Sequence, residues 1–248
     1  MTKAASTTAT DTLFARPLDD VAGFCFDDKV AAVFEDMIKR SVPGYATVVG
    51  ISGVLASHFA QPDSHIYDLG CALGATALAM ADSVSAPGCT VMAVDNSASM
   101  IQRLRERIET STIATPIQLV EDDILTTPID NASLVALNYT LQFVALEQRD
   151  ELLRRIFNGM RKGGVLVLSE KIHFEDPAIA RLCTELHHEF KRRQGYSDLE
   201  ISQKRSAIEN VLIPETIDTH ERRLRGAGFS RVEVWFQCFN FASLVAFK

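Results

Sequence analysis

The sequence lacks the cysteine patterns of disulfide-bonded and zinc-binding proteins and the long apolar runs of membrane proteins. Its five cysteines are scattered, odd in number and free of any C-x-x-C pair, so they predict neither a disulfide framework nor a zinc site. No apolar run approaches the roughly 18 residues of a membrane span. The opening stretch MTKAASTTATDT lacks the apolar segment of a signal peptide. We therefore expect a reduced, cytoplasmic protein without membrane contact or a bound metal.

The sequence also has fewer basic than acidic residues. The chain has 25 Lys and Arg against 32 Asp and Glu, which gives a formal net charge of -7 and an isoelectric point near 5.4. Nucleic-acid affinity is built largely from Lys and Arg that neutralise phosphates. The composition therefore argues against nucleic acid, including tRNA, as a directly bound partner.

Familiar hydrolase and nucleotidase signatures are missing as well. The sequence has no P-loop, no H-E-x-x-H and no Ser-His-Asp arrangement. What it does have is 248 residues that are 47% apolar, enough for one large domain with a substantial core. We expect a tail over residues 1–12 without stable structure and a single domain over 13–248.

The sequence pattern of this domain predicts an α/β fold. Strand-like segments such as HIYDL, TVMAVD, IQLVED, ASLVALNY and GVLVLSEK alternate with amphipathic helices, which predicts a parallel sheet covered on both faces. The last two strands, RVEVWFQC and FASLVAFK, are too close together for a crossover helix and must pair antiparallel. A seven-stranded, mostly parallel sheet that ends in such a hairpin is typical of the Rossmann-like methyltransferase fold that binds S-adenosylmethionine (SAM).

Helical segments flank this alternation. Residues 26–60 predict a helical N-terminal cap, with Asp27 as an N-cap and Pro43 and Gly44 breaking the helix before Tyr45. Residues from about 172 to 228 predict a helical insertion before the last two strands.

The stretch IYDLGCALGAT marks the end of the first strand. Asp68 leads into a turn through Gly70, Cys71 and Ala72 that closes at Gly74. This D-x-G-x-x-x-G spacing differs from the G-x-G-x-x-G of dinucleotide enzymes and resembles a SAM-binding loop. A tight strand-to-helix turn without a ligand is the alternative.

Residues after the later strands extend the candidate site, because ligands of open α/β sheets sit at the carboxyl ends of the strands. Asp95, followed by Asn96, is placed to accept hydrogen bonds from ribose hydroxyls, or else to cap the next helix. Asp123 and Ile124 could flank adenine or form a solvated acidic turn. Asn138 follows the fourth strand, where its amide has a catalytic or a structural role.

A basic stretch, KRRQGYSDLEISQKR, lies in the helical insertion. For Lys191, Arg192 and Arg193 we favour a solvated helix face. Arg205 could receive a carboxylate through its guanidinium fork, but local spacing does not decide this.

Several long segments resemble the carboxy-S-adenosyl-L-methionine (carboxy-SAM) synthase family. They are FDDKVAAVFEDMIKRSVPGY, DLGCALGAT, AVDNSASMI, LNYTLQF, LSEK, LEISQKRSAIENV and WFQCFNFASLVA. The resemblance runs from about Asp11 to the last residue. It implies that SAM and prephenate are converted to carboxy-SAM, phenylpyruvate and water, for the 5-oxyacetic acid modification of tRNA wobble uridine.

The resemblance also implies a mechanism and a homodimer. Prephenate loses carbon dioxide and hydroxide as it aromatises, hydroxide deprotonates the sulfonium methyl, and the resulting ylide captures the carbon dioxide. This route needs no strong protein base, in keeping with the absence of histidine from the strand-end loops. The helical insertion is the natural place for a dimer interface.

Ligand contacts implied by the resemblance fall on the motifs quoted above. Those near the reacting groups are Tyr45, Asn138 and Arg205, and those that hold the rest of SAM are Gly70, Cys71, Ala72, Asp95, Asn96, Asp123 and Ile124. Ala72 departs from the pattern, because a small hydroxyl residue is expected there. If that hydroxyl binds SAM in relatives, this chain lacks one hydrogen bond of about 0.5–1.5 kcal/mol.

Three other functions compete with this hypothesis. An ordinary small-molecule SAM methyltransferase would have the same fold, and so would a SAM-binding module without chemistry. A nicotinamide oxidoreductase is least favoured, because the loop spacing and the antiparallel end strands both disagree with it.

Overall fold

The computed structural model describes residues 9–17, 25–208 and 211–248, and within them a seven-stranded sheet forms the centre. The strand order is β3-β2-β1-β4-β5-β7-β6, with the first five strands parallel and β7 antiparallel to both β5 and β6. This confirms the predicted fold class. The strands are β1 (His65–Leu69), β2 (Thr90–Asp95), β3 (Ile117–Glu121), β4 (Ala132–Asn138), β5 (Met160–Lys171), β6 (Arg231–Cys238) and β7 (Phe241–Phe247).

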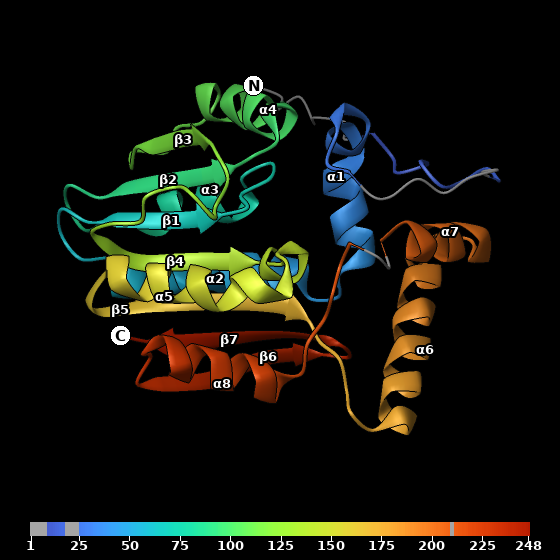
Figure 1. Ribbon diagram of the computed structural model, residues 1–248. Helices are drawn as coiled ribbons and strands as arrows, with labels where there is room; N and C mark the ends of the chain where they lie inside the picture. Colours follow the sequence, from blue (N-terminus) through green and yellow to red (C-terminus); the bar gives the residue numbers. More distant parts are fainter. Residues whose placement is uncertain (1–8, 18–24, 209–210) are drawn as a thin grey trace.

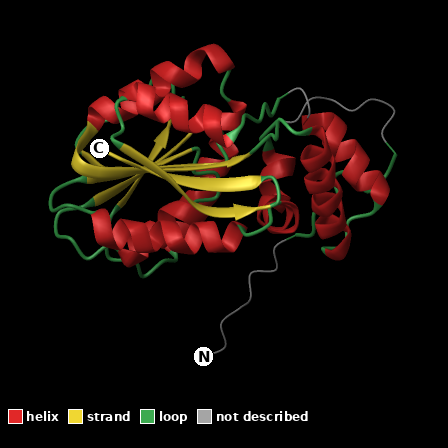
Figure 2. Cartoon of the chain, turned by 90° about the horizontal axis from the view of Figure 1, so that it is seen from below, coloured by secondary structure: helices red, strands yellow, loops and turns green. Residues whose placement is uncertain are grey.

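Helices cover both faces of this sheet (Figure 2). One apolar core lies between the sheet and α5 (Leu146–Gly159) with α8 (Ile217–Ala227). The other lies between the sheet and α2 (Tyr45–Phe59), α3 (Ala75–Ser83) and α4 (Ala98–Glu109). A sheet buried on both faces needs continuous apolar strands, and six of the seven residues of β4 are buried accordingly.

The N-terminal helices form as the capping residues predict. Asp27 accepts a hydrogen bond from the Val30 amide at 3.0 Å and starts α1 (Asp28–Ser41). Gly44, with φ of 77°, turns the chain into α2 at Tyr45. Among the described residues no single helix has both the length and the apolar character of a membrane span; α1 and α2 reach them only as a pair bent by 98°.

The predicted helical insertion divides into two parts. Helices α6 (Pro177–Arg193) and α7 (Asp198–Ile208) stand beside the carboxyl ends of the strands, next to α1 (Figure 1). Helix α8 instead packs on α5 and puts Leu224 into the sheet core. The insertion therefore ends before α8, because the apolar face of α8 is needed to cover β6 and β7.

The expected tail over residues 1–12 is too long. Asp11 is 2% exposed, and its carboxylate pairs with Lys204 at 3.1 Å and accepts from the Tyr196 hydroxyl at 2.5 Å. A partner 193 residues away holds this part of the chain, and no local pattern reveals it. The remainder of the expected tail, residues 1–8, lies outside the described residues.

Candidate active site

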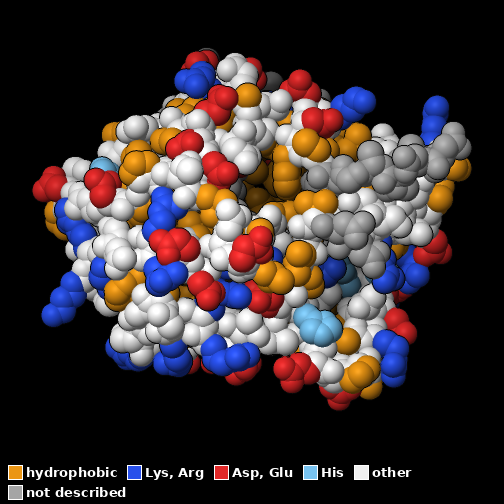
Figure 3. Space-filling view, in the orientation of Figure 1, with side chains coloured by type: hydrophobic (Ala, Val, Ile, Leu, Met, Phe, Trp, Pro, Cys, Tyr) orange, Lys and Arg blue, Asp and Glu red, His pale blue; other side chains and the backbone are white. Residues whose placement is uncertain are grey.

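A cavity of about 720 Å³ opens at the carboxyl ends of the parallel strands. This volume is within the range of about 300–1,000 Å³ usual for small-molecule sites. The face in Figure 3 is hollowed near its centre, and hydrophobic side chains line the hollow. Of the ten predicted site residues, all but Arg205 line the cavity: Tyr45, Gly70, Cys71, Ala72, Asp95, Asn96, Asp123, Ile124 and Asn138.

The glycine turn after β1 forms one wall. Gly70 has φ of 79°, and a side chain there would collide with Thr140. The amides of Gly70 and Cys71 both donate to the Val94 carbonyl at 2.9 Å. The turn is thereby tied to β2, and Gly70, Cys71 and Ala72 line the cavity.

Asp68, just before this turn, is buried beneath it and bonds to the helix that follows. Its carboxylate is 2% exposed and accepts from the Ala77 amide at 2.9 Å, in the first turn of α3. Burial raises the pKa of Asp68 to about 7, while the Ala77 hydrogen bond opposes the rise and the nearby Asp95 adds to it. A cationic ligand in the cavity would favour the ionised form of this carboxyl.

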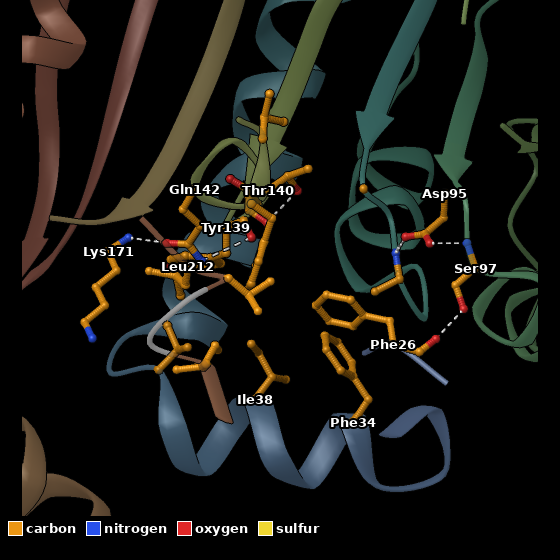
Figure 4. A pocket seen from close by; sticks show the side chains of 18 of the residues that line it. Phe26, Phe34, Ile38, Asp95, Ser97, Tyr139, Thr140, Gln142, Lys171 and Leu212 are labelled. Atoms are coloured by element: carbon orange, nitrogen blue, oxygen red, sulfur yellow. Dashed lines mark hydrogen bonds between the residues drawn. The ribbon is translucent and has the colours of Figure 1, made fainter. Parts of the chain in front are cut away.

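Asp95 joins the glycine turn to the start of α4. One carboxylate oxygen accepts from the Ala72 amide at 2.8 Å and the other from the Ser97 amide at 2.9 Å (Figure 4). Ser97 caps α4, so the capping role falls to a neighbour of Asp95, as the sequence allowed. Each carboxylate oxygen can accept a second hydrogen bond, which leaves Asp95 able to receive hydroxyl groups. Ala72 donates to Asp95 through its backbone amide, so this hydrogen bond does not depend on the Ala72 side chain.

Asp123 and Ile124 follow β3 at the same end of the cavity. Asp123 is exposed and accepts from the Leu125 amide at 2.9 Å, while Ile124 is 9% exposed. The aromatic residues Phe26, Phe34 and Phe143 face this end in edge contacts, with ring centroids 5.4–6.2 Å apart. Sequence reasoning missed these rings, because Phe143 is more than 100 residues from Phe26 and Phe34 and only the fold brings the three together.

Asn138 lies at the middle of the cavity in a hydrogen-bond network across three strands. Its amide group donates to Ser52 and Thr76, both at 3.2 Å, and its carbonyl accepts from Ser169 at 2.7 Å. Ser169 in turn contacts Ser243 of β7 at 2.7 Å. The amide is therefore held in one orientation, a structural role that places its edge at the cavity.

Two tyrosines pack beside Asn138. The rings of Tyr45 and Tyr139 have centroids 6.2 Å apart, and Tyr139 adopts a left-handed φ of 62° that few non-glycine residues take. Burial raises the pKa of both phenols. Both hydroxyls are neutral near pH 7, as unperturbed phenols are, and burial strengthens this preference.

A buried carboxyl lies directly behind this point. Glu170 is 0% exposed and accepts from the Leu141 amide at 3.0 Å. Burial raises the pKa of Glu170 from 4.5 to about 8, with Arg149 opposing the rise. Because this pKa is higher in the folded than in the unfolded chain, the free energy of unfolding should fall as pH rises from about 4.5 to about 8.

Glu170→Gln tests this pH dependence. The variant cannot ionise, so its stability should match that of the wild type within about 1 kcal/mol at pH 5 and exceed it increasingly up to pH 8. Denaturant unfolding at pH 5, 6.5 and 8 measures the difference. Glu233→Gln, an exposed position on β6, is the control, and equal pH slopes for the wild type and Glu170→Gln would contradict the prediction.

The other end of the cavity carries lysines that sequence reasoning did not assign to it. Lys171, Lys191 and Lys204 line it together with His187. The solvated-face interpretation holds for Arg192 and Arg193, which are exposed, but is wrong for Lys191. The reason is the fold of α6, which turns one side of its last turn toward the cavity. Figure 4 shows Lys171 and Asp95 on opposite sides, with Tyr139 and Gln142 between them.

Arg205 is exposed on α7 and lies outside the cavity of this chain, although its neighbour Lys204 lines the cavity. Its predicted contact with a carboxylate therefore needs a movement of α7 or a second copy of the chain. Within the described residues, no three His, Cys, Asp or Glu side chains gather as metal ligands would.

Comparisons with known proteins agree with the geometry. A family model described as "Methyltransferase domain" matches residues 66–164. Among solved structures, human N-acetylserotonin methyltransferase in complex with SAM superposes with a TM-score of 0.62 at 19% identity, over 89% of this chain and 55% of that one. An O-methyltransferase family protein from Burkholderia thailandensis gives 0.62 at 16% identity, over 90% and 60%. These solved chains are longer, and at such identities the likeness shows the fold alone.

Relatives with much higher identity cover nearly the whole chain. The carboxy-S-adenosyl-L-methionine synthase of Trichlorobacter lovleyi is 56% identical over 98% of this chain and all of its own length. That of Photobacterium profundum is 55% identical over 96% of this chain and 98% of its own. By this identity and coverage, the chain belongs to the carboxy-S-adenosyl-L-methionine synthase family.

Proposed function

We propose that this protein converts SAM and prephenate to carboxy-SAM, phenylpyruvate and water. The observation that carries the proposal is the 56% identity to a carboxy-SAM synthase over 98% of the chain. The product would be the carboxymethyl donor for modification of tRNA wobble uridine, a cytoplasmic process in which this acidic chain need not touch tRNA.

In this proposal the cavity holds SAM along the strand ends. Asp95 and Asn96 receive the ribose hydroxyls, and Asp123 and Ile124 flank adenine. The backbone of Gly70, Cys71 and Ala72 lies along the middle of the ligand. Tyr45 contacts the methionyl part, and the edge of Asn138 faces the sulfonium methyl. All nine side chains or backbone segments line one cavity, which supports the assignment.

The chemistry balances without a protein base. Prephenate loses its ring carboxylate as carbon dioxide and its ring hydroxyl as hydroxide while the ring aromatises. Hydroxide takes one proton from the sulfonium methyl to give water, and the ylide carbon bonds to carbon dioxide. His187 is the one histidine of the described cavity lining. Its Nε2 lies 2.8 Å from the Ser41 carbonyl, and burial lowers the pKa of His187 to about 3, so it is a poor base.

Mass spectrometry of small molecules separates this function from an ordinary methyltransferase. Purified protein incubated with SAM and prephenate should form a species heavier than SAM by one carbon dioxide, together with phenylpyruvate. Omission of prephenate is the control and should abolish both products. Formation of only the demethylated product of SAM, or no conversion, would overturn the proposal.

We also propose that the protein is a homodimer that uses α6. Ile179, Leu182 and Leu186 are 41%, 49% and 39% exposed, and their spacing of three and four residues places them on one helix face. These three side chains form an apolar stripe along α6 that is suited to a second copy, and Leu199 of α7 is a further exposed apolar residue of the insertion. Light scattering of the purified protein tests this, and a monomeric mass would contradict it.

Arg205→Ala tests the proposed carboxylate contact. An Arg–carboxylate hydrogen bond is worth about 1.5–3 kcal/mol, so carboxy-SAM formation or affinity should fall about 10- to 100-fold. Initial rates and carboxy-SAM binding measure the effect. Arg222→Ala, an exposed arginine on α8, is the matched control. Unchanged rates and affinity in Arg205→Ala would remove Arg205 from the site.

A further inference from the structure

The lysine end of the cavity is the end lined by Lys171, Lys191 and Lys204. Among these cations Lys191 stands out, because its side chain has no bonding partner in the described protein. The Lys204 ammonium lies 3.1 Å from the Asp11 carboxylate and donates to Ser41 at 2.9 Å, so its charge is compensated within the protein. His187 is held by the Ser41 carbonyl. No hydrogen bond or ion pair joins the Lys191 side chain to any described residue.

Lys191 is nevertheless only partly exposed to water where it lines the cavity. Burial lowers its pKa to about 7, and the charges of Lys204 and Lys171 lower it further. A desolvated ammonium beside other cations is costly unless an anion joins it. The lysine end is thus suited to bind an anionic group of a ligand.

A wall of rings leads from Lys191 to the middle of the cavity. Lys191 lies one helical turn after His187, whose ring packs edge-on against Phe241 with centroids 5.0 Å apart. Phe241 packs edge-on against Tyr139 at 6.2 Å, and Tyr139 packs against Tyr45 at 6.2 Å. Such a wall suits a flat six-membered ring that carries a carboxylate at one end.

We propose that Lys191 binds the side-chain carboxylate of prephenate, the one that remains in phenylpyruvate; this inference rests on the proposed function. The two carboxylates of prephenate make different demands on the site. The ring carboxylate must become neutral carbon dioxide, and an ion pair to it would stabilise the substrate more than the transition state and slow the reaction. The side-chain carboxylate keeps its charge throughout.

This arrangement orients the substrate. With the 2-oxoacid end held by Lys191 on α6, the ring lies along Phe241 and Tyr139, and the ring carboxylate points toward Asn138 and Tyr45. Carbon dioxide is then released next to the place proposed for the sulfonium methyl. Lys191 is in this sense a binding residue for both prephenate and the product that keeps the same carboxylate.

Lys191→Met tests the inference, because it keeps the length of the side chain and removes its charge. The KM for prephenate and the inhibition constant for phenylpyruvate should both rise about 10- to 100-fold, by similar factors. The dissociation constant for SAM should stay within about twofold. Lys191→Arg should recover most of the loss, and Arg193→Ala, an exposed position on the same helix with a side chain 77% exposed, is the matched control.

Three results would overturn the inference. Unchanged KM and inhibition constant would show that Lys191 does not meet the substrate. A raised KM with unchanged phenylpyruvate affinity would place Lys191 at the ring carboxylate instead. Loss of SAM affinity in Lys191→Met and Lys191→Arg alike would assign it a purely structural role.

Calorimetric titration of phenylpyruvate into the SAM-loaded protein separates this inference from the proposed function. Titration needs no turnover, so a 10- to 100-fold weaker binding in Lys191→Met than in Arg193→Ala would support the carboxylate site even in a protein that makes no carboxy-SAM. Equal binding in both variants would reject Lys191 even if carboxy-SAM is formed normally.

Discussion

Replacing Arg149 by Met should lower the free energy of unfolding by about 3–5 kcal/mol, because carbonyl groups that the buried guanidinium satisfies would lose their partner, at about 1–3 kcal/mol each. The Arg149 side chain is 0% exposed and lies 2.5 Å from the Glu215 carboxylate. It also donates to the carbonyls of Val144, Gln142 and Ile213, at 2.9, 3.2 and 3.0 Å. The carbonyls of Val144 and Ile213 would lose this partner, whereas Glu215 would keep Arg223 and the Gln142 carbonyl would keep the Ile213 amide.

The loss should be visible as a fall of the melting temperature by about 6–20 °C, since 1 kcal/mol shifts a domain of this size by about 2–4 °C. Arg154→Ala on the same helix is the control, because its ion pair with Glu151 is 57% and 60% exposed and such pairs contribute at most about 1 kcal/mol. An Arg149→Met variant as stable as Arg154→Ala would contradict this account.

Arg149 also connects stability to the cavity. Gln142 and Val144 line the cavity beside η1 (Leu141–Phe143), and Leu212 lines it from the segment before Ile213. One guanidinium therefore fixes two segments that are distant in sequence and meet at the ligand. Variants of Arg149 that remain folded should bind SAM and prephenate more weakly, although Arg149 touches neither in our proposal.

The second large effect is expected for Asp95→Ala. If Asp95 receives both ribose hydroxyls, the variant loses two hydrogen bonds to a charged acceptor, each worth about 1.5–3 kcal/mol. The dissociation constant for SAM should rise at least about 100-fold. Calorimetric titration with SAM measures it, and Asp82→Ala, an exposed position on α3, is the control.

Asp95→Asn separates ligand binding from loop structure. Asp95 accepts from the amides of Ala72 and Ser97, so the alanine variant also loosens the glycine turn. Asparagine keeps one acceptor oxygen, and burial, which raises the pKa of Asp95, makes a neutral residue tolerable there. The asparagine variant keeps one of the two loop hydrogen bonds, so it should melt above the alanine variant and still bind SAM more than about 10-fold more weakly than the wild type. Wild-type affinity in this variant would show that Asp95 serves the loop only.

Features that depend on local sequence were predicted well. The five residues of β1 occupy the range expected from HIYDL, Asp27 caps α1, and Tyr45 begins α2. The glycine turn, Asp95 and Asn138 were placed correctly at one sheet edge because parallel strands end on the same side. The antiparallel pairing of β6 with β7 followed from the two residues between them.

Features that depend on distant parts of the chain were not predicted. Asp11 is buried because Lys204 and Tyr196 lie beside it. Lys191 and the exposed Arg192 and Arg193 are adjacent in sequence, and only the packing of α6 against the rest of the fold separates them. Helix α8 was assigned to the insertion because periodicity shows that a helix has an apolar face but not which surface that face covers.

The hydrogen bonds from Asn138 through Ser169 to Ser243 have a consequence for how the protein is made. Ser243 and Phe241 belong to β7, the strand that fills the gap between β5 and β6. Residues of the glycine turn and of β1 to β4 leave the ribosome before β7 does. Until β7 has emerged, Ser169 lacks its contact with Ser243, and Tyr139 and His187 lack their contacts with Phe241. Synthesis at about 5–20 residues per second separates the emergence of Asn138 from that of Ser243 by several seconds. The reactive end of the cavity thus depends on the last strand of the chain, whereas the glycine turn and Asp95 are held by contacts within residues 70–97.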